Sequence, residues 1–326
     1  MLRDLSSRLE NLSGLLRANG LLLVLSLSLF TAGAYAAESV PVESEMAWWV
    51  LPLALFFVCF LMGIVAVPSG VGGGVLFVPI VGGFFPFHLD FVRAAGLLVA
   101  LASALSAGPM LLRGGLANLR LALPMALLAS ASSIAGAIMG LALPASTVQV
   151  ALGITILGIV ILMSSAKKSE FPDVQKPDRL SAALAMNGIF HDGATGKDMP
   201  WQVHRTPLAL LLFIGIGFLA GMFGMGAGWA NVPVLNLLMG APLKVSAGTS
   251  SFILSLVDSS AAWVYINKGA VLAVIAVPSV VGMMLGAMIG ARLLHVLRAS
   301  VVRRMVIFLL LFAGLRALLK GLGIWV

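Results

Sequence analysis

The residues best suited to bind an anion are glycines that interrupt two apolar runs with one spacing. GIVAVPSGVGGGVLFVP recurs 154 residues later as GFLAGMFGMGAGWANVP, with a proline five residues after the last glycine each time. A broken helix presents unpaired N–H groups and partial positive charge, which favour an anion. Close helix packing also uses small residues and is the alternative. The candidate glycines are Gly70, Gly72, Gly74, Gly224, Gly226 and Gly228.

The second glycine run is followed by polar side chains. Asn231 and Asn236 stand in GWANVPVLN beside Trp229. A buried amide needs a hydrogen-bond partner, supplied by a neighbouring helix or by a substrate. We expect Asn231 to contact substrate and Trp229 to form packing or a pocket wall.

Hydroxyl groups gather further along, in SAGTSSFILSLVDSS. Ser251, Ser255 and Asp258 follow one another at i, i+4 and i+7, so they share one face of a helix, with Thr249 and Ser250 beside that face at the helix start. Thr249, Ser250 and Ser251 are candidate ligands for the oxygens of an anion. The alternative is a bond from each hydroxyl to the preceding turn of its own helix.

Asp258 is the acid placed well inside an apolar segment. Ionisable groups there are costly and by default indicate function, so Asp258 is the candidate for coupling transport to protons. The alternatives are an ion pair with Lys268 or a position near the outer interface. The corresponding first-half positions, 104–106, carry no acid, so the two halves differ chemically.

Two basic residues, Arg93 and Lys244, stand near the start of the third apolar segment of each half. They are expected to attract an anion at the two mouths of a pathway. Anchoring at the membrane interface is the alternative.

The composition requires a membrane. The 326 residues are 60% hydrophobic and 10% charged, with mean hydropathy +1.10, whereas soluble domains carry about 25% charged residues. The basic residues that give the net charge of +8 are spread over a few loops, which argues against nucleic acid. No metal-binding, nucleotide-binding or nucleophile–base pattern is present, so we expect no cofactor, no metal and no enzyme activity.

The predicted fold is an all-α polytopic membrane protein of two homologous halves. Each half has a helix pair broken by Gly and Pro plus three further helices. If all ten segments cross, 16 of the 20 Lys and Arg lie on the cytoplasmic side and the halves are inverted repeats. If the short second segments do not cross, the repeats are parallel. The expected segments are 47–68, 72–87, 93–112, 119–141, 146–163, 207–224, 228–240, 245–264, 270–291 and 301–321.

The domain plan places membrane repeats at 47–163 and 207–326. Residues 1–46 hold an apolar segment, either a cleaved signal peptide or an extra helix, and an acidic linker. The loop 164–206 is predicted to be cytoplasmic, and its Gly-containing turn between two short apolar runs predicts a small β-hairpin.

GVGGG-x4-P in the first half and GMGAGWANVPVLNLLMGAPLKVSAGTSSF in the second resemble the TauE/SafE family of sulfite-exporter-like permeases. The resemblance covers roughly residues 47–325. It implies an inner-membrane permease, mostly found in bacteria, with two homologous halves of about four helices. It also implies small anionic substrates such as sulfite, organosulfonates or related carboxylates. The resemblance does not identify which residues of this sequence bind substrate.

The function expected is secondary transport of such an anion by alternating access, in contact with the lipid bilayer. An uncoupled anion channel and a membrane scaffold are the alternatives. Substrate identity, direction, coupling ion and oligomeric state stay open.

Overall fold

The computed structural model describes residues 49–69, 72–113, 116–165, 174, 176–192, 197–293 and 299–324. The N-terminal segment 1–46 and the candidate Gly70 lie outside the described residues.

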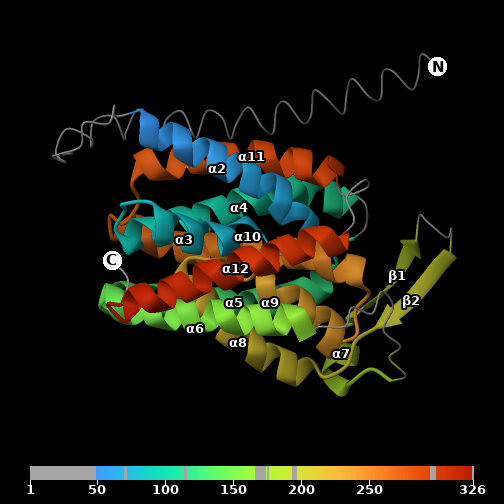
Figure 1. Ribbon diagram of the computed structural model, residues 1–326. Helices are drawn as coiled ribbons and strands as arrows, with labels where there is room; N and C mark the ends of the chain where they lie inside the picture. Colours follow the sequence, from blue (N-terminus) through green and yellow to red (C-terminus); the bar gives the residue numbers. More distant parts are fainter. Residues whose placement is uncertain are drawn as a thin grey trace, which may run out of the picture.

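Long helices lying side by side dominate the structure (Figure 1). The first half contains α2 (Val50–Ser69), α3 (Gly73–Phe84), α4 (Leu89–Arg113), α5 (Leu119–Ala142) and α6 (Ala145–Ser165). The second half contains α8 (Thr206–Phe223), α9 (Gly228–Pro233), the π-helix η2 (Val234–Leu238), α10 (Leu243–Asn267), α11 (Ala273–Leu293) and α12 (Ala299–Gly321). Between the halves lie α7 (Arg179–Ala183), β1 (Asn187–Asp192) and β2 (Lys197–Gln202).

The outer surface of the bundle is apolar, as lipid contact requires. Leu127, Ile161 and Phe308 each expose about two thirds of their surface. Within the described residues, five helices are long and apolar enough to cross a membrane: α4, α5, α6, α8 and α11. The short α3 and the α9–η2 pair fall where the sequence predicts segments too short to span.

The two halves interlock through small residues. A Cβ atom on Gly282 or Gly286 of α11 would collide with the carbonyl oxygen of Phe56 or Phe60 of α2, respectively. The α5–α8 contact has the same character: Gly221 lies directly on the carbonyl of Ser133. Glycine permits this close approach of two helix backbones. The fourth segment of each half, α5 or α11, thus packs on the first segment of the other half, α8 or α2.

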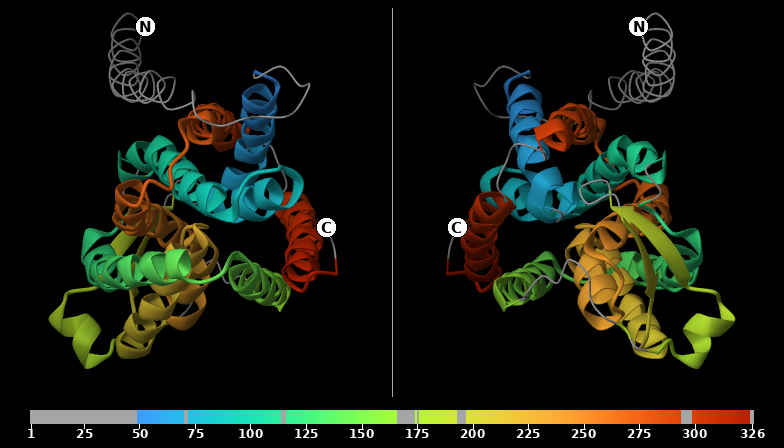
Figure 2. Two further views of the ribbon diagram at one scale, coloured as in Figure 1. Left: turned by 90° about the vertical axis from the view of Figure 1, so that its left-hand side faces the viewer. Right: turned by 90° about the vertical axis from the view of Figure 1, so that its right-hand side faces the viewer.

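The corresponding helices α6 and α12 run antiparallel beside each other at one side of the bundle, where α12 also contacts α3 (Figure 2). Gly314 of α12 packs against Ile156, whereas Gly321, later in the chain, packs against Val150, earlier in α6. The last helices of the two halves therefore point in opposite directions.

The strands β1 and β2 form an antiparallel hairpin in the stretch where the sequence predicts one, at one end of the bundle (Figure 1). Phe190 and Trp201 of the hairpin are buried in the hydrophobic core that also holds parts of α5, α8 and α10. Asp178 accepts hydrogen bonds from Ser181 N and from the hydroxyl of Thr206, the first residue of α8. The hairpin end is thereby fixed to the membrane helices.

Candidate functional site

Both helix breaks are held open by glycines in conformations that other residues avoid. Gly72, just before α3, has φ of 85°, and Gly224 and Gly226, between α8 and α9, have φ of 68° and 73°. Positive φ is accessible to glycine at no steric cost. The local sequence therefore forces α8 to end at Phe223 and α9 to start anew at Gly228.

The two breaks touch each other at the centre of the molecule. A Cβ atom on Gly74, at the start of α3, would lie 2.5 Å from the carbonyl oxygen of Met225 in the second break. Gly96 of α4 lies directly on the carbonyl of Gly224, and the Cβ of Ala100, one turn later, is 3.1 Å from a Cβ on Gly226. The breaks and α4 thus form one junction of closely packed, buried backbone.

Helix α10 presents successive turns to both breaks. The nearest atom to a Cβ on Gly72 is Cδ1 of Leu254, at 3.9 Å. One turn later the carboxyl oxygens of Asp258 lie 3.1 and 3.3 Å from a Cβ on Gly226. The side chain of Asp258 is therefore aimed at the break itself.

Asp258 is fully buried, and neither of its carboxyl oxygens has a hydrogen-bond partner. Within the described part of the chain no ion pair with Lys268 or any other cation forms. A buried carboxyl group without a partner costs free energy that a proton or a ligand must offset.

Asn231 shares this state. It is fully buried in α9, and neither its amide nitrogen nor its amide oxygen has a partner. The indole N–H of Trp229 is also buried and unpartnered. Asn236, in contrast, donates to the carbonyl of Ala241 at 2.8 Å and holds the turn after η2. Asn231 and Asp258 are thus polar groups that the fold leaves available for a ligand.

The hydroxyl candidates of α10 divide into three groups. Thr249 accepts a hydrogen bond from the backbone N–H of Asn118 at 3.1 Å, which ties α10 to the start of α5. Ser250 is buried. Ser251 and Ser255 donate to carbonyls of their own preceding turn, as in the alternative stated above. Both side chains also line a cavity.

This cavity lies between α4 and α10 and has a volume of about 190 Å³. The residues around it are Ala104, Leu105, Gly108, Gly248, Ser251, Phe252 and Ser255. Ser251, Ser255 and Asp258 follow the one face of α10 that the sequence predicts, so the cavity leads along this face toward Asp258.

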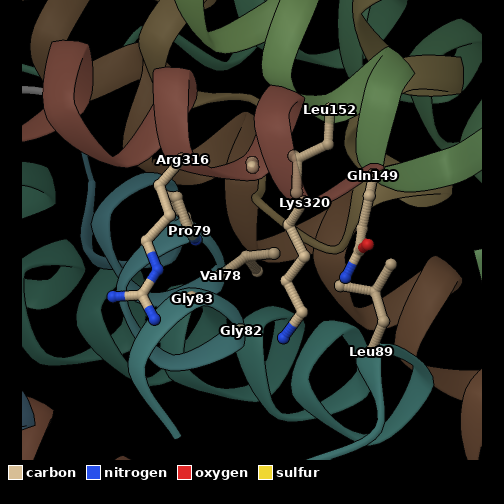
Figure 3. A pocket seen from close by; sticks show the side chains of 10 residues that line it. Val78, Pro79, Gly82, Gly83, Leu89, Gln149, Leu152, Arg316 and Lys320 are labelled. Carbon is tan, nitrogen blue, oxygen red and sulfur yellow. The ribbon is translucent and has the colours of Figure 1, made fainter. Parts of the chain in front are cut away.

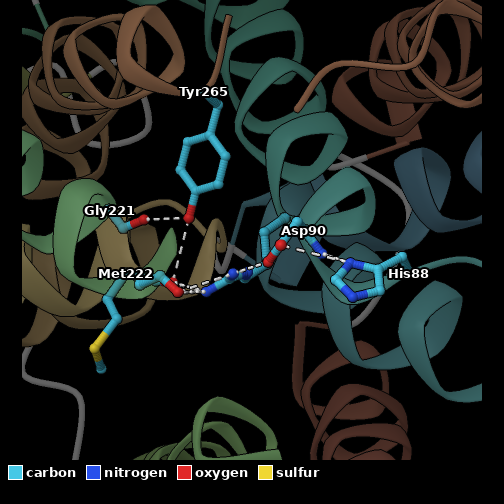
Figure 4. Close-up of polar contacts among 7 residues, drawn as sticks. His88, Asp90, Gly221, Met222 and Tyr265 are labelled. Atoms are coloured by element: carbon cyan, nitrogen blue, oxygen red, sulfur yellow. Dashed lines mark hydrogen bonds and ion pairs between the residues drawn. The ribbon is translucent and has the colours of Figure 1, made fainter. Parts of the chain in front are cut away.

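Arg93 is not at a mouth. Its side chain is fully buried and donates to the carbonyl oxygens of Gly140 and Met222 at 3.0 Å, and it pairs with Asp90. Tyr265 donates to the carbonyls of Gly221 and Met222 beside it (Figure 4). The guanidinium satisfies carbonyl groups at the ends of α5 and α8, which otherwise lack partners. This placement differs from the mouth position expected for Arg93.

Lys244 is exposed, and its ammonium lies 5.7 Å from the ring centre of Phe190 in the hairpin. The structure also brings together two basic residues that the sequence did not predict to be neighbours. Arg316 and Lys320 of α12 flank a pocket of about 10 Å³ beside α3 (Figure 3), where the Arg316 guanidinium stacks 4.2 Å from the ring centre of Phe84. That pocket holds a single water at most.

The remaining candidate glycines lie at the starts of the two short helices. Gly228 is buried as the first residue of α9, and Gly74 is buried in the first turn of α3. Sequence reasoning missed Ala100 and Met225, which touch the breaks, because neither residue type carries a signal. No group of three His, Cys, Asp or Glu side chains suited to a metal occurs among the residues described.

The sequence was compared with protein families and with known proteins. Residues 55–317 match the family described as sulfite exporter TauE/SafE. A stretch of 119 residues is 26% identical to the probable membrane transporter protein YunE of Bacillus subtilis (strain 168), covering 36% of this chain and 44% of that protein. The match thus spans less than half the length of this curated relative. No solved structure matches the chain. The family match extends over both halves and both helix breaks, and the chain is therefore a multi-pass membrane protein that belongs to the sulfite exporter TauE/SafE family.

Proposed function

We propose that the protein is a secondary permease that carries a small sulfite-like or organosulfonate-like anion across the membrane by alternating access. The observation that carries the proposal is the pair of buried, unpartnered groups that border the second helix break: Asn231 in the first turn of α9 and Asp258 facing Gly226. Buried polar groups without hydrogen-bond partners lower the stability of a membrane protein unless a ligand binds to them. The family description supports a sulfite-like substrate, and the name of the B. subtilis relative supports membrane transport.

The donors for the anion come from three sources. The amide NH2 of Asn231 donates from α9. The free N–H groups at the start of α3, a helix of 12 residues, add backbone donors and partial positive charge. Asp258 supplies the third donor when its carboxyl group holds a proton, because only the acid form carries an O–H.

The charge at the junction makes this proton part of the mechanism. The buried cation among the described residues, Arg93, is occupied by carbonyl groups and Asp90. A bound anion next to an ionised Asp258 would meet a like charge in a medium of low dielectric constant, where repulsion is strong. We infer that each anion binds together with a proton on Asp258, which couples its transport to the proton gradient.

We further propose that the two halves are inverted repeats that exchange roles during transport. The antiparallel course of the corresponding helices α6 and α12 supports this relation, because parallel repeats would give these two helices one direction. The reciprocal packing of α2 on α11 and of α5 on α8 supports it too. Such repeats move against each other around a site at the bilayer midplane.

The distribution of Lys and Arg supports an orientation with the hairpin in the cytoplasm of a bacterium and the helices in its inner membrane. The bacterial origin of the relative agrees with this location.

The test is flux into proteoliposomes with sulfite, sulfate, thiosulfate, sulfoacetate and acetate as a panel. We expect saturable uptake of one anion, accelerated by an acidic outer solution, and its loss in Asn231→Leu. Gly215→Ala is the matched control, because nothing lies within 4 Å of a Cβ atom there. Rapid flux that ignores the pH gradient would instead indicate a channel. Absence of flux for every anion, with folded protein, would contradict transport of this substrate class.

A further inference from the structure

We propose that the cavity between α4 and α10 is the access chamber through which substrate reaches Asp258 from the hairpin side. We further propose that a packed cluster around Tyr265 is the closed form of the same chamber on the opposite side. This inference rests on the proposed function and adds to it the route, the open side and the residues that close the other side.

The chamber lies on the hairpin side of Asp258. Helix α10 begins at Leu243, beside the hairpin, where Lys244 lies over Phe190. The chamber residues Ser251 and Ser255 come next along the helix, and Asp258 follows them. A ligand that enters the chamber therefore approaches Asp258 from the end of the bundle that carries the hairpin.

The opposite end of the same helix pair is closely packed. Ala94 and Leu97 of α4 and Ala261, Ala262 and Tyr265 of α10 form a buried cluster in which each side chain is at most 3% exposed. The described residues beyond Asp258 thus pack α4 against α10 on this side.

Polar bonds fasten this closed end to the neighbouring helices. Tyr265 donates to carbonyls of Gly221 and Met222 at the end of α8 (Figure 4). Arg93, one residue before the cluster, reaches Met222 and also Gly140 at the end of α5. Opening this end requires α10 to release α8, so the Tyr265 hydroxyl acts as a latch.

The repeat relates the open and the closed end to each other. Corresponding positions of the two halves lie 154 residues apart. Chamber positions 248 and 251 therefore correspond to 94 and 97, and chamber position 108 corresponds to 262. Gly248, Ser251 and Gly108 surround the cavity, whereas Ala94, Leu97 and Ala262 form the packed cluster. Corresponding positions are therefore open on one side and closed on the other, which is the asymmetry that alternating access between two halves requires.

Thiol accessibility tests this assignment without any substrate. The native Cys59, which is buried, is replaced in the background variant Cys59→Ala. Single cysteines are then introduced as Ser251→Cys in the chamber and Leu97→Cys in the cluster. A membrane-impermeant thiol reagent is applied to inside-out and right-side-out vesicles. We expect Ser251→Cys to react only from the hairpin side and Leu97→Cys to resist the reagent from both sides.

The latch is tested by adding Tyr265→Phe to both cysteine variants. Loss of about one net hydrogen bond shifts the two-state equilibrium about fivefold toward the other opening. Leu97→Cys should then react about fivefold faster from the side opposite the hairpin, and Ser251→Cys should react more slowly. Ser255→Cys and Ala262→Cys repeat the comparison if either first variant fails to fold.

Two results would overturn the inference. One is reaction of Leu97→Cys without the Tyr265 change, at a rate like that of Ser251→Cys. The other is an unreactive thiol at both position 251 and position 255 in folded protein. Because labelling needs no transported anion, either result can occur beside normal flux, and loss of flux can occur beside the expected labelling. The chamber and the transport function are thus tested separately.

Discussion

The carboxyl group of Asp258 faces Gly226 across the second helix break, with Oδ2 3.1 Å from the position of a Cβ atom on that glycine. The glycine leaves room for the carboxyl group, and the carboxyl group has no hydrogen-bond partner there. The contact joins the break, which is local in sequence, to a helix that begins 17 residues later. It is the point at which we propose that an anion and a proton meet.

Replacement of Gly226 by alanine should abolish transport and lower stability. The residue has φ of 73°, and its Cβ atom would lie 3.1 Å from both Ala100 and Asp258. A non-glycine residue with positive φ costs about 1–2 kcal/mol. Thermal unfolding in detergent and flux in liposomes measure the two effects. Gly215→Ala, at an open helical position, should leave both unchanged, and equal effects of the two substitutions would contradict this account.

The two asparagines of the second break should behave in opposite ways. Asn231→Leu should abolish flux while stability is kept or increased, since a buried group without partners is replaced by an apolar one of similar size. Asn236→Leu should lower the unfolding free energy by about 0.5–1.5 kcal/mol, because it removes the amide donor to the Ala241 carbonyl, which keeps the longer bond from the Ser246 hydroxyl. Melting curves and flux on both variants decide the matter. A large loss of stability in Asn231→Leu would show that the residue is structural.

Asp258→Asn should keep the fold and lose proton coupling. The amide is close in size to the acid, and no hydrogen bond to Asp258 is broken. In the wild type an acidic outer solution should speed uptake, and an imposed membrane potential should have little effect because one proton and one singly charged anion together are neutral. The measurement is uptake under each gradient in turn. Acceleration by acid that persists in Asp258→Asn would place the proton elsewhere.

Asp178 should stabilise the hairpin end in a pH-dependent manner. Partial burial raises its pKa, but hydrogen bonds from Thr206 and Ser181 outweigh this and hold the pKa of Asp178 below its usual range. The stabilisation is therefore complete above the unfolded-state pKa of about 3.9 and is lost as pH falls through the lower folded-state value. Asp178→Ala should unfold at lower temperature at neutral pH, and the difference from wild type should become smaller in strong acid.

The matched variant for this prediction is Asp178→Asn. Asparagine caps a helix N-terminus about as well as aspartate but does not ionise in this range. It should retain most of the stability without the acid-dependent change. An Asp178→Ala difference that stays constant with pH would contradict the role of the carboxylate.

Local sequence patterns predicted much of the fold and part of the candidate site. Apolar segments and their interruptions predicted the long helices to within a few residues, because lipid contact and helix length impose these patterns directly. The repeated glycines predicted both breaks, since positive φ at Gly224 and Gly226 is a property of the local backbone. The helical spacing also predicted that Ser251, Ser255 and Asp258 share a face.

The partners of these elements followed from tertiary packing alone. The chain places Arg93 at the start of a segment, which indicated a mouth, yet the fold buries it against Gly140 and Met222, which are 47 and 129 residues away. Likewise Gly74 meets Met225, and no spacing in the sequence encodes this contact. The sequence by itself determined a membrane protein of two related halves with glycine-broken helices and polar groups near the breaks. Only the tertiary structure decided which break faces Asp258 and which end of the α4–α10 pair is open, because these depend on close contacts between distant helices.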